Sequence, residues 1–295
     1  MMNFTEFKEY VAANINDIVE DSVKGEPEIM TVRKANETYT GLTLCRGEDA
    51  ALPTANLELF FRMYQESGLE NAMEQIAACL SMEMPQGVPF EEVLSSWEAA
   101  KEHVACRAAG FQGNEELAED GPCELIEGIL LLYYLDLDAG DGGVFSARIT
   151  YDVLEKLGIS EEELKKEALS LAKEHYPPEI MRFSKEMTIV TSSSHGAAAL
   201  FYPDVLEKLA EEIGGSCYLI PSSIHEWIAV PEEHLQPEQL LVMLREANRT
   251  VVEPKDRLSD DLYRYDAEMK RFSKALPDET IAMSGRLCKG GELYA

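Results

Sequence analysis

The residues with the clearest potential for chemistry are Ser222, Ser223, His225 and Glu226. A serine hydrolase needs a hydroxyl nucleophile, a histidine base within hydrogen-bond reach and a carboxylate that orients the histidine. If a strand begins at Ser223, alternation places Ser223 and His225 on one face and Glu226 on the other. The sequence also lacks a Gly-x-Ser-x-Gly turn that exposes a strained nucleophile. The sequence therefore favours local hydrogen bonding in a tight strand connection, with Ser223, His225 and Glu226 kept as catalytic candidates.

A second cluster of serines and a histidine runs from Ser192 to Gly196. Small residues let other groups approach the backbone closely, so these amides could form an anion-binding nest. A turn between two strands uses the same residue types for steric reasons alone. The sequence favours the turn.

The third cluster consists of Tyr263, Arg264 and Asp266. Its aromatic ring and guanidinium could stack on a base or a protein partner, which makes these residues binding candidates. Their acidic neighbours favour a packing anchor with an internal salt bridge. A pocket shared with His225 requires that segments about 40 positions apart converge in space.

Patterns typical of metal and nucleotide sites are incomplete. His103 and Cys106 lie one helical turn apart, but no second pair completes a tetrahedral set. The acidic stretch from Asp136 to Gly142 departs from a calcium loop at loop positions 5, 6 and 12. The sequence also contains no glycine-rich phosphate-binding motif. We therefore expect no metal and no cofactor.

Charge is the most unusual global property of the chain, which has a formal net charge of −29 over 295 residues. Between Arg46 and Asp141 there are 20 acidic and four basic residues, a net −16. Such a surface repels nucleic-acid phosphates and anionic lipids and attracts basic surfaces. We expect no direct nucleic-acid or membrane binding, and either a basic protein partner or a surface that serves only solubility.

The compartment follows from three further features. The first residues lack the basic and apolar stretches of a secretory signal. The longest apolar run, Ile129 to Leu135, is too short to span a membrane. The six cysteines are dispersed, which is typical of reduced thiols. We therefore expect a cytoplasmic protein.

Periodicity predicts an N-terminal region over residues 1–120. Apolar residues at spacings of three and four from Phe4 to Ile18 indicate an amphipathic helix, and the stretches 28–34 and 38–45 indicate a hairpin. An acidic helical region follows Pro53 and, after an interruption by two prolines, is expected to resume through Val93, Trp97 and Val104.

A second region, 121–272, is predicted to be an α/β core, followed by a weakly patterned tail at 273–295. Ile126 to Leu135 is a buried helix or strand, Asp138 to Gly143 is a turn, and Ser160 with Glu163 forms the capping box of a helix. We expect strands at 144–149, 187–192, 197–202, 217–221 and 225–230. We expect helices at 205–213 and from Pro237 onward. Because the strands come in adjacent pairs, the expected class is α/β in the broad sense, namely α+β. Its sheet is mixed or antiparallel and flanked by helices.

Several stretches resemble a known family. They are Ile220 to Glu226, Leu258 to Asp260, Tyr263 to Asp266, Gly196 to Ala198 and Gly158 to Leu164. Over roughly residues 3 to 270 the chain is similar to the uncharacterised bacterial domain-of-unknown-function family 5688. The resemblance implies the extent of the domain and a bacterial, non-secreted setting. It implies no reaction.

Two hypotheses of function follow from the sequence. The first is a non-enzymatic binding or regulatory protein that docks a basic protein surface through the acidic residues between Glu58 and Glu127. One form of it is an inhibitor whose carboxylates mimic nucleic-acid phosphates. The alternative is a small-molecule-binding protein or hydrolase-like enzyme with its site near Ser223, His225 and Glu226. The incomplete catalytic sets favour the first.

Overall fold

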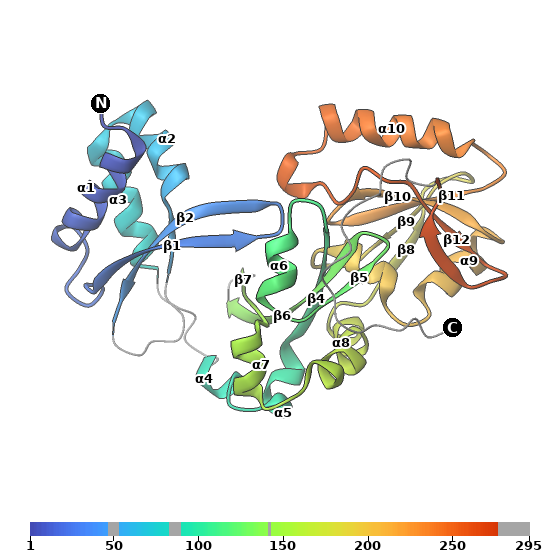
Figure 1. Ribbon diagram of the computed structural model, residues 1–295, viewed down its shortest axis with the longest axis horizontal. Coiled ribbons are helices and arrows are strands. Elements are labelled where there is room, and N and C mark those ends of the chain that lie inside the picture. Colours follow the sequence, from blue (N-terminus) through green and yellow to red (C-terminus); the bar gives the residue numbers. More distant parts are fainter. Residues whose placement is uncertain (47–52, 83–89, 141–142, 277–295) are drawn as a thin grey trace.

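The computed structural model describes residues 1–46, 53–82, 90–140 and 143–276. Its strands form three sheets, in which every described pairing is antiparallel, with helices on their flanks (Figure 1). The predicted α+β class is confirmed, and the sheets are antiparallel. No helix in the described ranges is long and apolar enough to cross a membrane.

The N-terminal unit, defined as the described part of residues 1–82, has a hydrophobic core of its own. Helix α1 (Phe4–Asn14) starts at a capping box in which Asn3 and Glu6 exchange hydrogen bonds. Strands β1 (Glu26–Lys34) and β2 (Glu37–Cys45) form the predicted hairpin, and β3 (Ala55–Asn56) adds a short third strand. Helices α2 (Leu57–Ser67) and α3 (Leu69–Leu80) contribute to the core. The predicted helix, hairpin and following helical region are confirmed.

The second sheet is built around strand β6 (Ile129–Gly140), which settles the open choice between helix and strand for this apolar run. Strand β4 (Val104–Gly110) pairs with one side of β6, and β5 (Cys123–Ile126) and β7 (Gly143–Arg148) pair with the other. The predicted boundary at residue 120 falls within this sheet. Part of the predicted turn from Asp138 to Gly143 lies outside the described residues.

The expectation that the acidic helical region continues through Val104 is wrong. Short helices α4 (Phe90–Val93) and α5 (Trp97–Ala100) are followed by a 3-10 turn, η2 (Lys101–His103), and then by strand β4. Of the seven residues of β4, all but Arg107 are buried. A strand buried on both faces lacks the alternation that distinguishes it from a helix, which explains the error.

The third sheet has six strands in the order β13-β12-β10-β11-β9-β8. They are β8 (Glu179–Arg182), β9 (Thr188–Thr191), β10 (Cys217–Ser223), β11 (Glu226–Pro231), β12 (Tyr263–Asp266) and β13 (Arg271–Lys274). The accompanying helices are α6 (Glu115–Asp120), α7 (Tyr151–Leu157), α8 (Glu161–His175), α9 (Val205–Ile213) and α10 (Pro237–Thr250). The capping box of Ser160 and Glu163 at the start of α8 is confirmed.

The predicted strand over Ala197–Tyr202 is wrong, because this stretch is the 3-10 helix η3 (Gly196–Phe201). Its first five residues are buried, and the Trp227 indole N–H donates to the Ala197 carbonyl over 2.8 Å. A short apolar run bounded by turn residues has no periodicity that excludes a strand. The small side chains let η3 lie close to β4 and β9.

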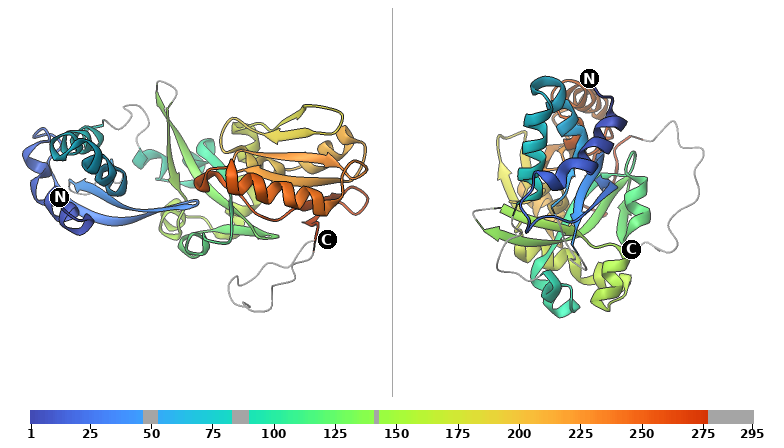
Figure 2. Two further views of the ribbon diagram at one scale, coloured as in Figure 1. Left: turned by 90° about the horizontal axis from the view of Figure 1, so that it is seen from above. Right: turned by 90° about the vertical axis from the view of Figure 1, so that its left-hand side faces the viewer.

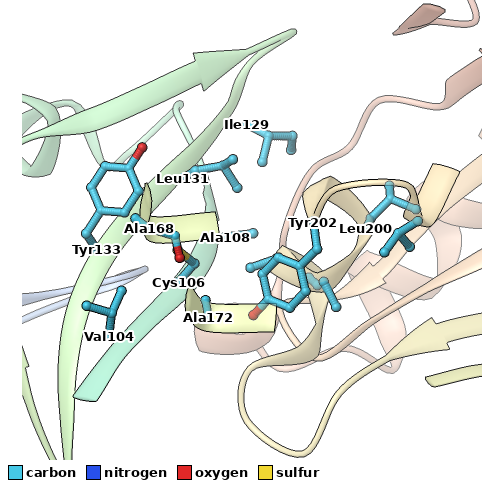
Figure 3. Close-up of a cluster of buried hydrophobic side chains, with 14 of the residues drawn as sticks. Val104, Cys106, Ala108, Ile129, Leu131, Tyr133, Ala168, Ala172, Leu200 and Tyr202 are labelled. Carbon is cyan, nitrogen blue, oxygen red and sulfur yellow. The ribbon is translucent and has the colours of Figure 1, made fainter. Parts of the chain in front are cut away.

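One hydrophobic core joins the second and third sheets. Cys106 and Ala108 on β4 face Ala168 and Ala172 on α8, and Leu200 of η3 belongs to the same cluster (Figure 3). The cluster extends to Trp227 and Tyr263 in the third sheet. Residues between Val93 and Phe272 therefore contribute to a single packed body, whereas the N-terminal unit packs around separate residues.

The tip of the β1–β2 hairpin connects the N-terminal unit to this body. The hairpin reaches past α6 toward the end of α10, as the views in Figures 1 and 2 show. Asn36 has the left-handed backbone that a tight hairpin turn requires, with φ at 59°. Its amide nitrogen donates to the carbonyl oxygens of Lys255 (3.0 Å) and Arg257 (2.6 Å), and its backbone N–H donates to Asn114 Oδ1 (2.7 Å).

We predict that Asn36→Gly, which keeps the turn conformation but removes the side-chain hydrogen bonds, lowers the free energy of unfolding by about 1–3 kcal/mol. Urea unfolding and hydrogen exchange in β1 and β2 measure the effect. Lys270→Gly is the control, because Lys270 also has positive φ but lies exposed in another turn. Equal losses in the two variants contradict the role assigned to the hairpin tip.

Candidate functional site

The serine and histidine predicted as catalytic lie in the turn between β10 and β11. Ser222 Oγ donates to Glu226 Oε1 over 3.0 Å, and the His225 backbone N–H donates to Ser223 Oγ over 3.1 Å. Both hydroxyls and the carboxylate thus bond within the turn, as the local interpretation expects. The His225 ring is oriented toward another segment, with its Nε2 3.6 Å from Asp256 Oδ1.

The predicted binding cluster on β12 is part of the core and its rim. Tyr263 is fully buried, its ring stacks on Phe272 at 5.0 Å between centroids, and its hydroxyl lies 3.1 Å from Ser259 Oγ. Arg264 forms ion pairs with Glu232 and with Asp266, the latter at 2.7 Å. This is the geometry of a packing anchor with an internal salt bridge.

The two predicted clusters do not meet in a common pocket. Strand β12 pairs with the first residues of β10, so that Tyr263 lies opposite Leu219 and Tyr265 lies opposite Cys217. The turn that carries Ser223 and His225 is at the other end of β10. Asp266 therefore lies at the end of the sheet away from His225.

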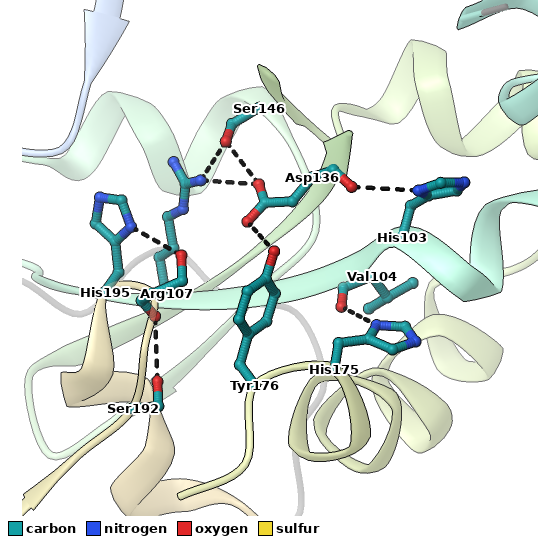
Figure 4. Close-up of polar contacts among 10 residues, drawn as sticks. His103, Val104, Arg107, Asp136, Ser146, His175, Tyr176, Ser192 and His195 are labelled. Atoms are coloured by element: carbon teal, nitrogen blue, oxygen red, sulfur yellow. Dashed lines mark hydrogen bonds and ion pairs between the residues drawn. The ribbon is translucent and has the colours of Figure 1, made fainter. Parts of the chain in front are cut away.

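Polar groups from four segments instead gather around Asp136, in a cluster that we call the Asp136 network (Figure 4). Arg107 of β4 donates to Asp136 Oδ1 over 2.8 Å and also to the Ser146 hydroxyl on β7. The Ser146 hydroxyl donates to the same carboxylate oxygen over 2.6 Å. Tyr176, just beyond α8, donates to Asp136 Oδ2 over 2.9 Å. The carboxylate is 1% exposed and has partners at both oxygens.

Several histidines lie near this network, and two of them, His195 and His225, are close to each other. His195, in the turn between β9 and η3, has a left-handed backbone with φ at 45°, and its ring centroid is 5.8 Å from that of His225. The Ser194 hydroxyl lies 3.4 Å from His195 Nδ1. Burial, with further contributions from the positive charge of Arg107 and from His225, lowers the pKa of His195 to about 4. His195 is therefore neutral at physiological pH.

The chemistry open to this region is hydrogen bonding to a polar group. The Arg107 guanidinium packs over the Tyr134 ring, 4.2 Å from its centroid, and its Nε is buried without a hydrogen-bond partner in the described chain. Neutral His195 and exposed His225 add further donors or acceptors. Within the described ranges, no three His, Cys, Asp or Glu side chains converge as metal ligands.

Sequence reasoning singled out His195 and His225 but missed the Asp136 network. Arg107 and Tyr176 are 29 and 40 positions from Asp136, so no short motif joins them. The sequence contains one indication of this network: Asp136 directly follows the apolar run that ends at Leu135. A carboxylate inside a buried strand requires a partner, which only the fold identifies.

Gly196 brings the His195 turn and the β10–β11 turn together. A Cβ at this position overlaps the His225 carbonyl oxygen and lies 2.9 Å from Thr191 Cα, both of which are backbone atoms. The two turns therefore approach each other more closely than any side chain allows.

We predict that Gly196→Ala destabilises the protein by roughly 1–3 kcal/mol, because the backbone of one turn must shift. Ser193→Ala, at an exposed position of the same turn, is the control and is expected to unfold like the wild type. Urea unfolding compares them, and a Gly196→Ala variant of unchanged stability contradicts this packing.

The lowered pKa of His195 predicts a pH dependence of stability. Unfolded histidine takes up its proton near pH 6.5, whereas folded His195 does so near pH 4. Between these values the unfolded state binds more protons, so stability falls as the pH falls from 6.5 to 4, by at most about 1.4 kcal/mol per pH unit. In His195→Asn, which tolerates the left-handed backbone, this part of the slope disappears.

The measurement is urea unfolding of wild type and His195→Asn across this pH range. The exposed His234 provides the control variant His234→Asn, which removes an imidazole that the fold does not bury. Equal slopes for wild type and His195→Asn contradict the assignment.

Comparison with known proteins supports the family resemblance. No curated protein and no solved structure matches the chain. The model of a family of unknown function, DUF5688, matches residues 4–195 and 184–267, which together cover most of the chain. The resemblance predicted from the sequence motifs is confirmed: the protein belongs to the DUF5688 family.

Proposed function

We propose that the protein is a non-enzymatic binding protein that docks a basic protein surface through acidic side chains of its N-terminal unit. The observation that carries this proposal is the environment of Glu66, Glu70 and Glu74. All three are exposed on α2 and α3, and none forms an ion pair with a described basic residue.

Some other acidic residues of the 58–127 region have partners within the chain. Glu58 accepts from Thr40, both at the backbone N–H and at the hydroxyl (2.8 Å each). Glu116 pairs with Arg33 and Glu98 with Lys101. The proposed docking face is therefore narrower than the acidic region defined from the sequence.

The uncompensated charges carry an energetic cost that a partner relieves. Glu70 and Glu74 are four residues apart on α3, so they project from the same face and repel each other by a few tenths of a kcal/mol. A basic partner replaces this repulsion with attraction. Its effect is mainly on the rate of encounter, because exposed charges are screened by salt.

The proposal also includes a location in the cell and a more specific form of docking. We place the protein in a bacterial cytoplasm, supported by the buried thiols of Cys106 and Cys217, which form no disulfide within the described residues. In the specific form, the carboxylates bind to a nucleic-acid-binding protein at the sites where it normally binds phosphates. Release of such a partner by added DNA distinguishes this form from other basic partners.

The proposal predicts a stoichiometric basic partner that is recovered at low salt and lost at about 0.5 M salt. Glu70→Lys with Glu74→Lys is expected to weaken the association roughly tenfold at low salt. The matched control is Glu211→Lys with Glu238→Lys, which makes the same change of net charge at exposed positions of α9 and α10.

Affinity purification from the source cells, repeated with each variant, is the test. Equal loss of the partner in both double variants indicates a response to net charge alone and contradicts the proposed face. Recovery without any partner contradicts docking and favours the alternative of a small-molecule or hydrolase-like site near Ser223, His225 and Glu226.

A further inference from the structure

A groove of about 430 Å³ lies between the N-terminal hairpin and the second sheet. One wall is strand β1, with Thr31 and Arg33, and the opposite wall is formed by Arg148 at the end of β7 and Asp152 in α7. Leu117 of α6 supplies an apolar surface. The volume falls within the range of small-ligand sites, roughly 300–1,000 Å³.

Arg148 is the cation in this groove with donors to spare. Its Nη2 donates to the Leu117 carbonyl oxygen, and its Nε is buried and out of reach of a ligand. Its Nη1 donates to no described residue. A guanidinium has five N–H donors arranged for contact with a carboxylate, so a ligand oxygen at Nη1 gains hydrogen bonds that the protein does not supply.

The other charges of the groove differ in how far they are already matched. Arg33 pairs with Glu116 and lies 4.0 Å from Asp120, a second carboxylate that also lines the groove, so its charge is more than balanced within the protein. Asp152 is exposed and forms no ion pair within the described chain. Arg148 is thus available to bind a negatively charged ligand group, and Asp152 is available to bind a positively charged one.

We propose that this groove binds a small zwitterion of the α-amino-acid class. The ligand carboxylate contacts Nη1 of the Arg148 guanidinium, its ammonium group contacts the Asp152 carboxylate, and its side chain lies against Leu117. A simple anion satisfies Arg148 but is repelled by Asp152, and a simple cation has the opposite mismatch.

This binding is independent of the proposed docking, since the groove and the acidic face share no residues. Its walls come from the N-terminal unit and from the central body, which also meet at Asn36 and through the ion pair of Arg33 with Glu116. A bound ligand therefore adds a further connection between them.

Isothermal titration of the full chain with L-leucine, L-glutamate, L-lysine and glycylglycine tests the proposal. We expect saturable binding of at least one of these zwitterions. Acetate and methylammonium, which each carry half of the recognition group, are expected to bind at least roughly tenfold more weakly. The absence of binding by every zwitterion at millimolar concentration overturns the proposal, as does acetate binding of equal strength.

Two variants locate the site. Arg148→Lys keeps the charge but loses the planar fork, and is expected to weaken binding roughly tenfold. Asp152→Asn, at an exposed position, is expected to have a similar effect and keeps the test valid if Arg148→Lys fails to fold. The control Arg249→Lys changes an exposed arginine on α10 and leaves binding unchanged. Full binding by both groove variants overturns the assignment.

Discussion

The buried carboxylate of Asp136 is the constraint on which the centre of this structure depends. A charge removed from water costs several kcal/mol unless an opposite charge and hydrogen bonds replace the lost hydration. Here the replacement requires Arg107 from β4, Ser146 from β7 and Tyr176 from beyond α8. The carboxylate thereby sets the relative positions of two strands on either side of β6 and of the end of α8. It also holds the Arg107 guanidinium over Tyr134 and near His195.

How well the sequence predicts an element of this fold depends on whether neighbouring or distant residues determine its conformation. The cap at Ser160 and the hairpin turn at Asn36 are formed by neighbouring residues, and they appear where the sequence places them. Strand β4 and helix η3 are short apolar stretches whose conformation depends on contacts with distant elements. Periodicity could not assign either of them, because both are buried on all sides.

The candidate site shows the same difference between local interactions, which the sequence reveals, and long-range interactions, which it does not. Serines and carboxylates close together in sequence attracted a catalytic interpretation, yet Ser222 and Ser223 bond to Glu226 and to the His225 backbone within one turn. Polar side chains in turns are already close to unpaired backbone groups, which explains this outcome. The Asp136 network joins residues that are far apart in sequence. The one indication of it in the sequence was that an aspartate directly follows an apolar run. His195 was visible as a residue, but its lowered pKa arises from burial and from charges on other segments.

The distribution of charge connects the two proposed binding surfaces. Carboxylates at the packed interior and its rim, such as Asp136 and Asp266, have arginine partners, so the net charge of −29 is carried mainly at the exterior. An exterior of one sign acts over about a Debye length and attracts any basic surface, which favours rapid but salt-sensitive encounter. The groove beside Arg148 is different, because it contains charges of both signs. A zwitterion has no net charge, so its binding in the groove is expected to depend on salt less than docking does. The two interactions are thus separable by a single physical variable, and neither requires the other.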